Sequence, residues 1–355
     1  MNRHADFSFR NLDPIFASAP TRSLTPESRI IIFSDLHMGN GGKNDDFRQN
    51  AGVFSSVLEH WYLPRRHHLI LNGDVEELLR FSLHSIQRQW HEVFSIFDRY
   101  RAEVGMDRII GNHDYPLADV TDLPFPLHDG LRYRIDDEDV FIFHGHQVHP
   151  RYVSPKKQRW INFFLRYFAN PLGIGNVTVS HDSRKRFKTE RRVYHYASVR
   201  KVLSVIGHTH RPLFESLSKA DTIKFQIELM CRRYTESDGP VRERLAEQIA
   251  SLKSELETLR GDPHFEESDE SLYNANLVVP CMFNSGGVIG ERGITGIEIE
   301  GRTIRLVYWF DATRSQTYLR YRRFHAEQLN GTSFYRVIIK EDSLDYIFAR
   351  IRLLS

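Results

Sequence analysis

Residues 29–37 read RIIIFSDLH, so an apolar run is followed at once by two groups able to bind a metal ion, Asp35 and His37. A run of this kind, without polar alternation, is typical of a strand that is buried on both faces. Residues i and i+2 of an extended segment point to the same side, so Asp35 and His37 are able to bind one cation together. The stretch predicts a buried strand with metal ligands at its carboxyl end.

Four further apolar runs end in the same manner. They are Leu69 to Leu71, Arg108 to Ile110, Val140 to Phe143 and Val202 to Ile206, and they lead into Asn72-Gly73-Asp74, Gly111-Asn112-His113-Asp114, His144-Gly145-His146 and Gly207-His208-Thr209-His210. In open α/β sheets the ligand crevice lies outside the carboxyl ends of the strands, where these side chains would converge. Taken singly, such motifs also fit surface turns, helix caps or buried histidines. It is the ordered set of five that favours a shared metal site.

Helical patterns alternate with these runs. The patterns at 46–62 and 84–101 separate the first three runs, which argues for stacked α and β layers, and 277–310 returns to β patterning. Residues 1–28 are proline-punctuated and lack a clear period, so we expect an N-terminal arm that lies over the domain or is partly disordered. Residues 312–355 are expected to form a C-terminal extension that ends in an amphipathic helix.

Two insertions interrupt the alternation, and both are expected to be mainly helical. The first, at about 151–201, has an aromatic stripe (Trp160, Phe163, Phe164, Tyr167, Phe168) followed by a basic segment (Arg184, Lys185, Arg186, Lys188, Arg191, Arg192). This insertion either forms a cap over the site, or its aromatic stripe packs on the core while its basic segment faces the solvent. The second, at about 215–275, carries Leu245, Ile249, Leu252, Leu256 and Leu259, the spacing of a helix that packs along a partner helix. We expect a helical hairpin that packs on its own domain or makes a homo-oligomer contact.

The composition is that of a globular protein, since 41% of the 355 residues are apolar and 26% are charged. The net charge of +2 is too small to indicate nucleic acid or an acidic membrane as a partner. The two cysteines, Cys231 and Cys281, match no paired metal or redox spacing, so we expect thiols. No apolar run approaches the roughly 18 residues of a membrane span and the N-terminus lacks a secretory signal, so a cytoplasmic location is expected.

Taken in order, the five motifs resemble the calcineurin-like metallophosphoesterase superfamily, whose pattern is D-x-H, G-D, G-N-H-D, H-G and G-H-x-H. The match spans about residues 29–212. The resemblance implies a four-layer α/β/β/α sandwich of two sheets flanked by helices, within a phosphoesterase domain at about 29–311. It also implies a dinuclear centre in which Asp35, His37 and His210 hold one ion, Asp74 bridges both ions, and Asn112, His144 and His208 hold the other.

The same resemblance implies an activity. Two divalent ions lower the pKa of a shared water, so a bridging hydroxide would attack the phosphorus of an ester or anhydride. The mixed donor set suits Mn²⁺, with Fe²⁺ or Zn²⁺ as alternatives, better than Ca²⁺. His113 resembles the family's catalytic histidine, which stabilises charge on the phosphoryl group or protonates the leaving oxygen. Asp114 would orient that imidazole, or cap the following turn.

The sequence is compatible with several classes of substrate. The first insertion resembles, more loosely, the helical cap of UDP-diacylglucosamine hydrolases, which hold a lipid with a diphosphate head; such a substrate would place the protein at the membrane periphery. Those hydrolases read G-N-R-D where this chain has His113, and they lack the 215–275 insertion. Gly-Asp-Val-Glu-Glu at 73–77 disfavours a protein phosphatase. We therefore expect a phosphorylated small molecule or lipid, with a low-activity metal-binding scaffold as the alternative.

Overall fold

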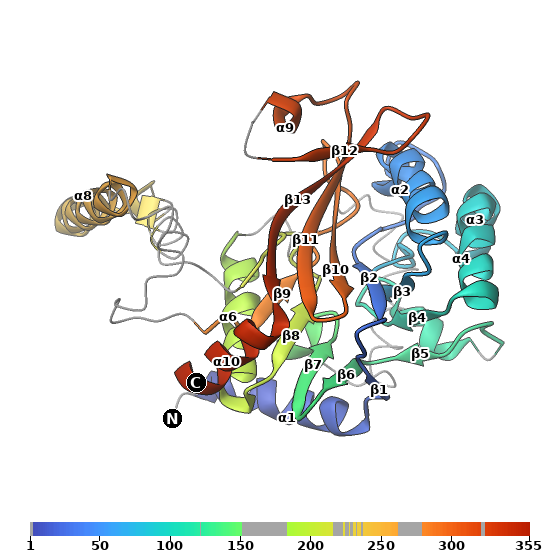
Figure 1. Ribbon diagram of the computed structural model, residues 1–355. Coiled ribbons are helices and arrows are strands. Elements are labelled where there is room, and N and C mark those ends of the chain that lie inside the picture. Colours follow the sequence, from blue (N-terminus) through green and yellow to red (C-terminus); the bar gives the residue numbers. More distant parts are fainter. Residues whose placement is uncertain are drawn as a thin grey trace.

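The structure, a computed structural model, describes residues 3–120, 122–150, 183–215, 237–261, 279–320 and 324–355, together with a few helical positions between 223 and 235. Two β-sheets pack face to face in this part of the chain, and helices cover their outer faces (Figure 1). The α/β sandwich expected from the sequence is confirmed. The aromatic stripe from Trp160 to Phe168 falls outside the described residues.

Within the described chain, the larger sheet has eight strands. Their order across the sheet is β12 (Ala326–Gln328), β13 (Phe334–Ser343), β11 (Thr303–Asp311), β10 (Ile294–Glu300), β2 (Arg29–Phe33), β3 (His68–Asn72), β4 (Met106–Ile109) and β5 (Leu127–His128). Strands β2 to β5 are parallel, whereas β10, β11, β12 and β13 are antiparallel to their neighbours. The carboxyl ends of β2, β3 and β4 therefore share one edge of the sheet.

Strand β2 is buried on both faces, as its sequence predicts. Ile30 and Ile32 pack into the core between the two sheets, whereas Ile31 and Phe33 pack into a second core beneath the outer helices. The register sets Ile31 beside Leu69 of β3, so the second core continues along the sheet. Because both faces are covered, each residue of the run is apolar and the two-residue alternation disappears.

The smaller sheet has five strands in the described residues. In order they are β1 (Thr21–Ser23), β6 (Leu131–Ile135), β7 (Glu138–Ile142), β8 (Leu203–Ile206) and β9 (Met282–Asn284). Strands β7, β8 and β9 are parallel, so the segments that follow β7 and β8 also leave from one edge. The β patterning expected at 277–310 corresponds to β9, β10 and β11.

Helical segments cover the outer face of the larger sheet (Figure 1). They are η1 (Phe47–Gln49), α2 (Ala51–Val57), η2 (Leu58–Tyr62), α3 (Leu83–Gln89) and α4 (His91–Glu103). The pattern at 46–62 is helical as expected but changes from a 3-10 turn through an α-helix to a π turn. The pattern at 84–101 is interrupted at Trp90, whose indole nitrogen donates to the Gly39 carbonyl (3.0 Å) and the Asp45 carboxylate (3.1 Å).

Helix α1 (Arg3–Ser18) replaces the arm expected at the N-terminus. It buries Leu12 and Ile15 against the smaller sheet, and Asn11 Nδ2 donates a hydrogen bond to the Gln147 carbonyl (2.8 Å). The helical conformation was not expected because Pro14, which suggested punctuation, lies inside the helix. The packing of an apolar face outweighs the low helix propensity of one proline.

The C-terminal segment is also more than an extension. Strands β12 and β13 add to the larger sheet, and short α9 (Thr317–Arg320) precedes them. The expected amphipathic helix is α10 (Leu344–Leu354), which begins after Ser343 and buries Leu344, Ile347 and Ile351. Strands β12 and β13 and helix α10 are thus integral to the sandwich.

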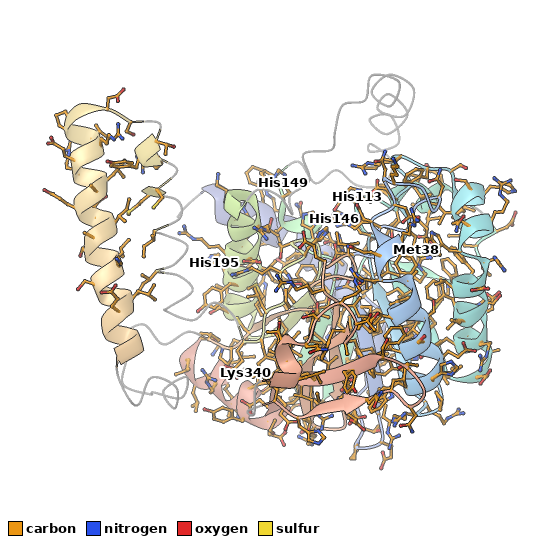
Figure 2. All side chains as sticks on the ribbon, turned by 90° about the horizontal axis from the view of Figure 1, so that it is seen from above. Met38, His113, His146, His149, His195 and Lys340 are labelled. Carbon is orange, nitrogen blue, oxygen red and sulfur yellow. The ribbon has the colours of Figure 1, made fainter. Side chains whose placement is uncertain are left out.

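The two insertions are helical where the structure describes them. Helix α6 (Ser183–Arg200) exposes Lys188 and Arg191 but buries Val193 and Tyr196 against the smaller sheet, in keeping with a solvated basic face. Helix α8 (Gly239–Gly261) stands apart from the two sheets (Figures 1 and 2). None of the described helices combines the length and apolar composition that a membrane crossing requires.

Candidate metal centre

The five motifs meet at one edge of the sandwich, because they follow β2, β3 and β4 in one sheet and β7 and β8 in the other. Five expected ligands have positive φ angles, between 49° and 65°: Asp35, His37, Asp74, His208 and His210. Left-handed backbone is unfavourable for such residues and is held only by its surroundings. The chain therefore turns sharply at the strand ends. This turn, and not the extended alternation assumed above, brings Asp35 and His37 together.

One group consists of Asp35, His37 and His210, whose donor atoms all lie within 4.8 Å of one another. His210 Nε2 is 3.1 Å from Asp35 Oδ1 and 3.1 Å from His37 Nε2. Asp35 is fully buried, which raises its pKa, but His210 and His144 outweigh the burial and the pKa is lowered. A carboxylate that stays charged in the interior is suited to binding a cation.

A second group consists of Asp74, His144 and His208, again within 4.8 Å. His144 Nε2 lies 3.1 Å from Asp74 Oδ2 and 4.0 Å from Asp35 Oδ1, so it adjoins both groups. His144 Nδ1 donates to the Asn72 carbonyl (2.7 Å), which fixes the tautomer and leaves Nε2 facing the carboxylates. Burial opposes ionisation of Asp74, yet His144 and His113 hold its pKa well below the usual range.

Asp74 also belongs to a third group, with His37 and His113. It therefore connects the His37 side of the site with the His144 side, the place that the resemblance assigns to a bridging ligand. The Gly111 position must lack a side chain, because a Cβ there would overlap the carboxylate and the backbone nitrogen of Asp74. The third motif can approach Asp74 this closely only as glycine.

The residues present fit divalent cations. The donors are carboxylates and imidazoles, and nearly all of these side chains are buried. Asn112 Oδ1 and His144 Nε2 are buried atoms without a hydrogen bond of acceptable geometry in the described structure. Buried polar atoms are rarely left without partners, so both are consistent with donors to a bound ion. Asn112 lies next to His113, whose backbone N–H donates to Asp74 Oδ1 (2.8 Å).

Glu77, which was not among the expected site residues, contacts two of the imidazoles. Its carboxylate accepts from His37 Nδ1 (3.0 Å) and from His113 Nδ1 (2.8 Å). Burial raises the pKa of Glu77, but hydrogen bonds from His113 and His37 outweigh it and lower the pKa to about 2. The available signal was an acidic residue three positions after Asp74, in the segment used above only to disfavour protein phosphatases.

Asp114 does not contact the His113 imidazole. Its carboxylate accepts from the backbone N–H groups of Val75 (2.9 Å) and Gly111 (2.6 Å), and it makes no side-chain cap to the following 3-10 turn, η3 (Tyr115–Asp119). Burial, with the nearby Asp74, raises the pKa of Asp114 to about 7. Asp114 thus ties the second motif to the third, while Glu77 makes the contact with His113 that was expected of Asp114.

Further histidines surround the centre. His146 begins the short η4 (His146–Val148), and its ring lies 5.4 Å from that of His144 and 6.2 Å from that of His208. Burial, and then the positive charge of His144, lower its pKa well below the usual value. In Figure 2, His113, His146 and His149 lie on one side of the molecule and Lys340 on the opposite side. The site is therefore rich in imidazole well beyond the expected ligands.

The two-sheet fold and the three buried clusters agree with what the resemblance to calcineurin-like metallophosphoesterases implied. No protein-family profile and no curated protein matches the chain. Among solved structures, a single mutant of Vps29 from Entamoeba histolytica is similar at 10% identity and a TM-score of 0.33, covering 81% of this chain and 94% of that one. A dimetal phosphatase from Danio rerio is similar at 12% identity and a TM-score of 0.26, covering 53% and 70%. Both likenesses are distant, so the chemistry of the site rests on its own residues.

Proposed function

We propose that the protein is a metal-dependent phosphoesterase that hydrolyses a phosphomonoester, phosphodiester or diphosphate. The observation that carries the proposal is the convergence of three Asp and His groups, of which two share Asp74 and one contains His113. These side chains come from five separate strand ends, and a purely structural role does not require so many charged and titratable groups in one buried place.

The proposed roles combine the three groups with the ligand pattern that the resemblance implies. Asp35, His37 and His210 would hold one divalent ion, Asn112, His144 and His208 the other, and Asp74 both; the mixed donor set favours Mn²⁺, with Fe²⁺ or Zn²⁺ as alternatives. When bound, two such ions activate water and offset charge on the phosphoryl oxygens. Asp114 keeps the second and third motifs in register through the N–H groups of Val75 and Gly111.

In this proposal His113 acts on the substrate. Its Nδ1–H donates to Glu77, so Nε2 is the ring nitrogen left to face the phosphoryl group. Burial lowers the pKa of His113, but Asp74 and Glu77 outweigh it and raise the pKa to about 9. A histidine oriented in this way would stabilise negative charge on the phosphoryl oxygens or donate a proton to the leaving oxygen.

The test compares the wild type with Asp74→Asn. We expect manganese-dependent hydrolysis of p-nitrophenyl phosphate or of its diester by the wild type, and loss of both turnover and bound manganese in the variant. Asp98→Asn is the matched control, because Asp98 is an exposed carboxylate on α4 whose side chain is 67% exposed. Unchanged turnover in Asp74→Asn would refute the proposal.

A second candidate is a metal-binding scaffold with little turnover, which the position of α8 away from the sheets favours. It predicts a folded wild type that binds manganese but hydrolyses neither aryl phosphate. His113→Ala separates the candidates further. In an enzyme it lowers kcat by about 100- to 10,000-fold while leaving the manganese content unchanged. A panel of monoesters, diesters, nucleotides and UDP-lipids then distinguishes a lipid diphosphatase from the other substrate classes.

A further inference from the structure

Glu190 is a buried carboxylate that belongs to none of the three metal-binding groups. It lies on α6, the helix that covers the smaller sheet, and its side chain is fully inaccessible. A buried carboxylate costs several kcal/mol of desolvation unless it is well paired. The identity of its partners therefore indicates what this residue stabilises.

All hydrogen bonds of Glu190 within the described part of the chain go to one loop. Glu190 Oε1 accepts from Thr209 Oγ1 (2.9 Å) and from Arg211 Nε (3.2 Å), and Oε2 accepts from Arg211 Nη2 (2.7 Å). Thr209 and Arg211 stand on either side of His210, and Thr209 also follows His208 directly. Glu190 thus holds the residues next to both histidines of the fifth motif.

The Thr209 hydroxyl is held from a second direction as well. Asn284, the last residue of β9, donates from Nδ2 to Thr209 Oγ1 (2.8 Å) and to the Gly207 carbonyl (3.2 Å). The hydroxyl therefore accepts one hydrogen bond from the sheet and donates one to the helix, which leaves Thr209 a single rotamer that satisfies both. Thr209 is fully buried between the two candidate ligands.

The backbone of this loop needs such support. His208 has φ of 65° and His210 has φ of 55°, so left-handed residues flank Thr209 on both sides. Each such residue costs on the order of 1–2 kcal/mol, and the conformation persists only where the surroundings impose it. The contacts of Glu190 act between and beside these two positions, where a release would let both histidines turn away.

We infer that Glu190 is a positioning residue for the ligand pair His208 and His210, acting through Thr209 and Arg211. The inference rests on the proposed metal centre, since it assigns the two histidines to metal binding. Loss of outer-shell partners of metal ligands lowers metal affinity by about 10- to 100-fold. A fold change of that size is expected from Glu190→Gln.

The chain offers a closely matched control in Glu298. It is also a buried glutamate, paired through two nitrogens of Arg336 and accepting from one hydroxyl, that of Tyr62 (2.7 Å), but it lies in the larger sheet and contacts none of the site residues. Glu298→Gln therefore reproduces the loss of a buried charge without touching the fifth motif. Thr209→Val and Thr209→Ser form a second pair, because only serine keeps the hydroxyl.

Two measurements test the inference. Amide hydrogen exchange of the metal-stripped protein reports on the loop itself, and we expect faster exchange at His208 in Glu190→Gln than in Glu298→Gln. Titration with Mn²⁺ should show affinity about 10- to 100-fold weaker in Glu190→Gln and Thr209→Val, and near wild type in Thr209→Ser and Glu298→Gln.

The two measurements separate the inference from the proposed function. Equal exchange at His208 in Glu190→Gln and Glu298→Gln would overturn the positioning role, whatever the metal titration gives. A wild type that does not bind Mn²⁺ would overturn both the proposed centre and the assignment of the histidines as its ligands. Equal Mn²⁺ affinity in Thr209→Val and Thr209→Ser would also count against the inference, and this pair still decides if Glu190→Gln does not fold.

Discussion

Replacing Glu77 by glutamine tests how the site holds two of its imidazoles at once. The carboxylate accepts from His37 Nδ1 (3.0 Å) and from His113 Nδ1 (2.8 Å). Glutamine has nearly the same shape and its amide oxygen can still accept from both imidazoles, but it carries no charge, so both hydrogen bonds become neutral and weaker. Hydrogen bonds to charged groups contribute about 1.5–3 kcal/mol each. Loss of the charge from these two bonds corresponds to a decrease in kcat of about 10- to 100-fold.

The two variants Glu77→Gln and His113→Ala should differ in whether they lose manganese affinity as well as kcat. Because His37 is a candidate ligand and His113 is not required for binding the ions, Glu77→Gln should lower both manganese affinity and kcat, whereas His113→Ala should lower kcat alone. The assay is steady-state hydrolysis of an aryl phosphate, with the metal content of each preparation measured in parallel. Glu59→Gln is the control, since Glu59 lies in η2 and pairs with Arg99 at the surface. Wild-type kcat and metal affinity in Glu77→Gln would refute the reasoning.

Three further outcomes are expected. Gly207→Ala would set a Cβ 2.6 Å from the Asp35 carboxylate and should lower the free energy of unfolding by about 1–3 kcal/mol, measured by urea denaturation. Gly52→Ala is the control, because this position on α2 faces open space, and it should raise the free energy of unfolding by roughly 0.5–1 kcal/mol. The pKa of Glu300 is lowered to about 2, chiefly by a hydrogen bond from His67. The contribution of Glu300 to the free energy of unfolding is therefore complete above its ordinary pKa near 4.5 and is lost as the pH falls toward 2. In Glu300→Gln the free energy of unfolding should depend less on pH over this range. Adding Mn²⁺ to stripped protein should raise Tm, by the equivalent of about 2.7 kcal/mol at 100 times Kd, and a chelator should reverse it.

The sequence predicted the central strands of the sandwich better than its N-terminal and C-terminal elements. Apolar runs ending in Asp, His or Asn identify β2, β3, β4, β7 and β8, because burial on both faces leaves a signal that does not depend on context. Helix α1 was missed since Pro14 outweighed the spacing of its apolar residues. Strand β13 was missed because it pairs with β11 through a register shift, and such pairing is a property of the assembled sheet.

The side chains that gather at the strand ends were expected from the sequence, but the contacts that hold them in place were not. All expected ligands except Asn112 meet in the three groups, and they could be expected to meet because each follows a strand end. Glu77, Glu190 and the backbone contacts of Asp114 could not be found in this way. Their partners lie 36 residues away for the Glu77–His113 pair, 19 for Glu190–Thr209 and 39 for Asp114–Val75, and only the fold brings them together. Supporting contacts of this kind have no local spacing that a single sequence reveals.

The left-handed backbone at Asp35, His37, Asp74, His208 and His210 has a consequence for tolerance to mutation. At each of these positions glycine would relieve torsional strain that the native side chain imposes on its own peptide unit. A library of variants selected only for thermal stability should therefore be enriched in glycine at these five positions, and the selected variants would be more stable but inactive. Natural retention of aspartate and histidine there would mean that the strain is tolerated for what those side chains do.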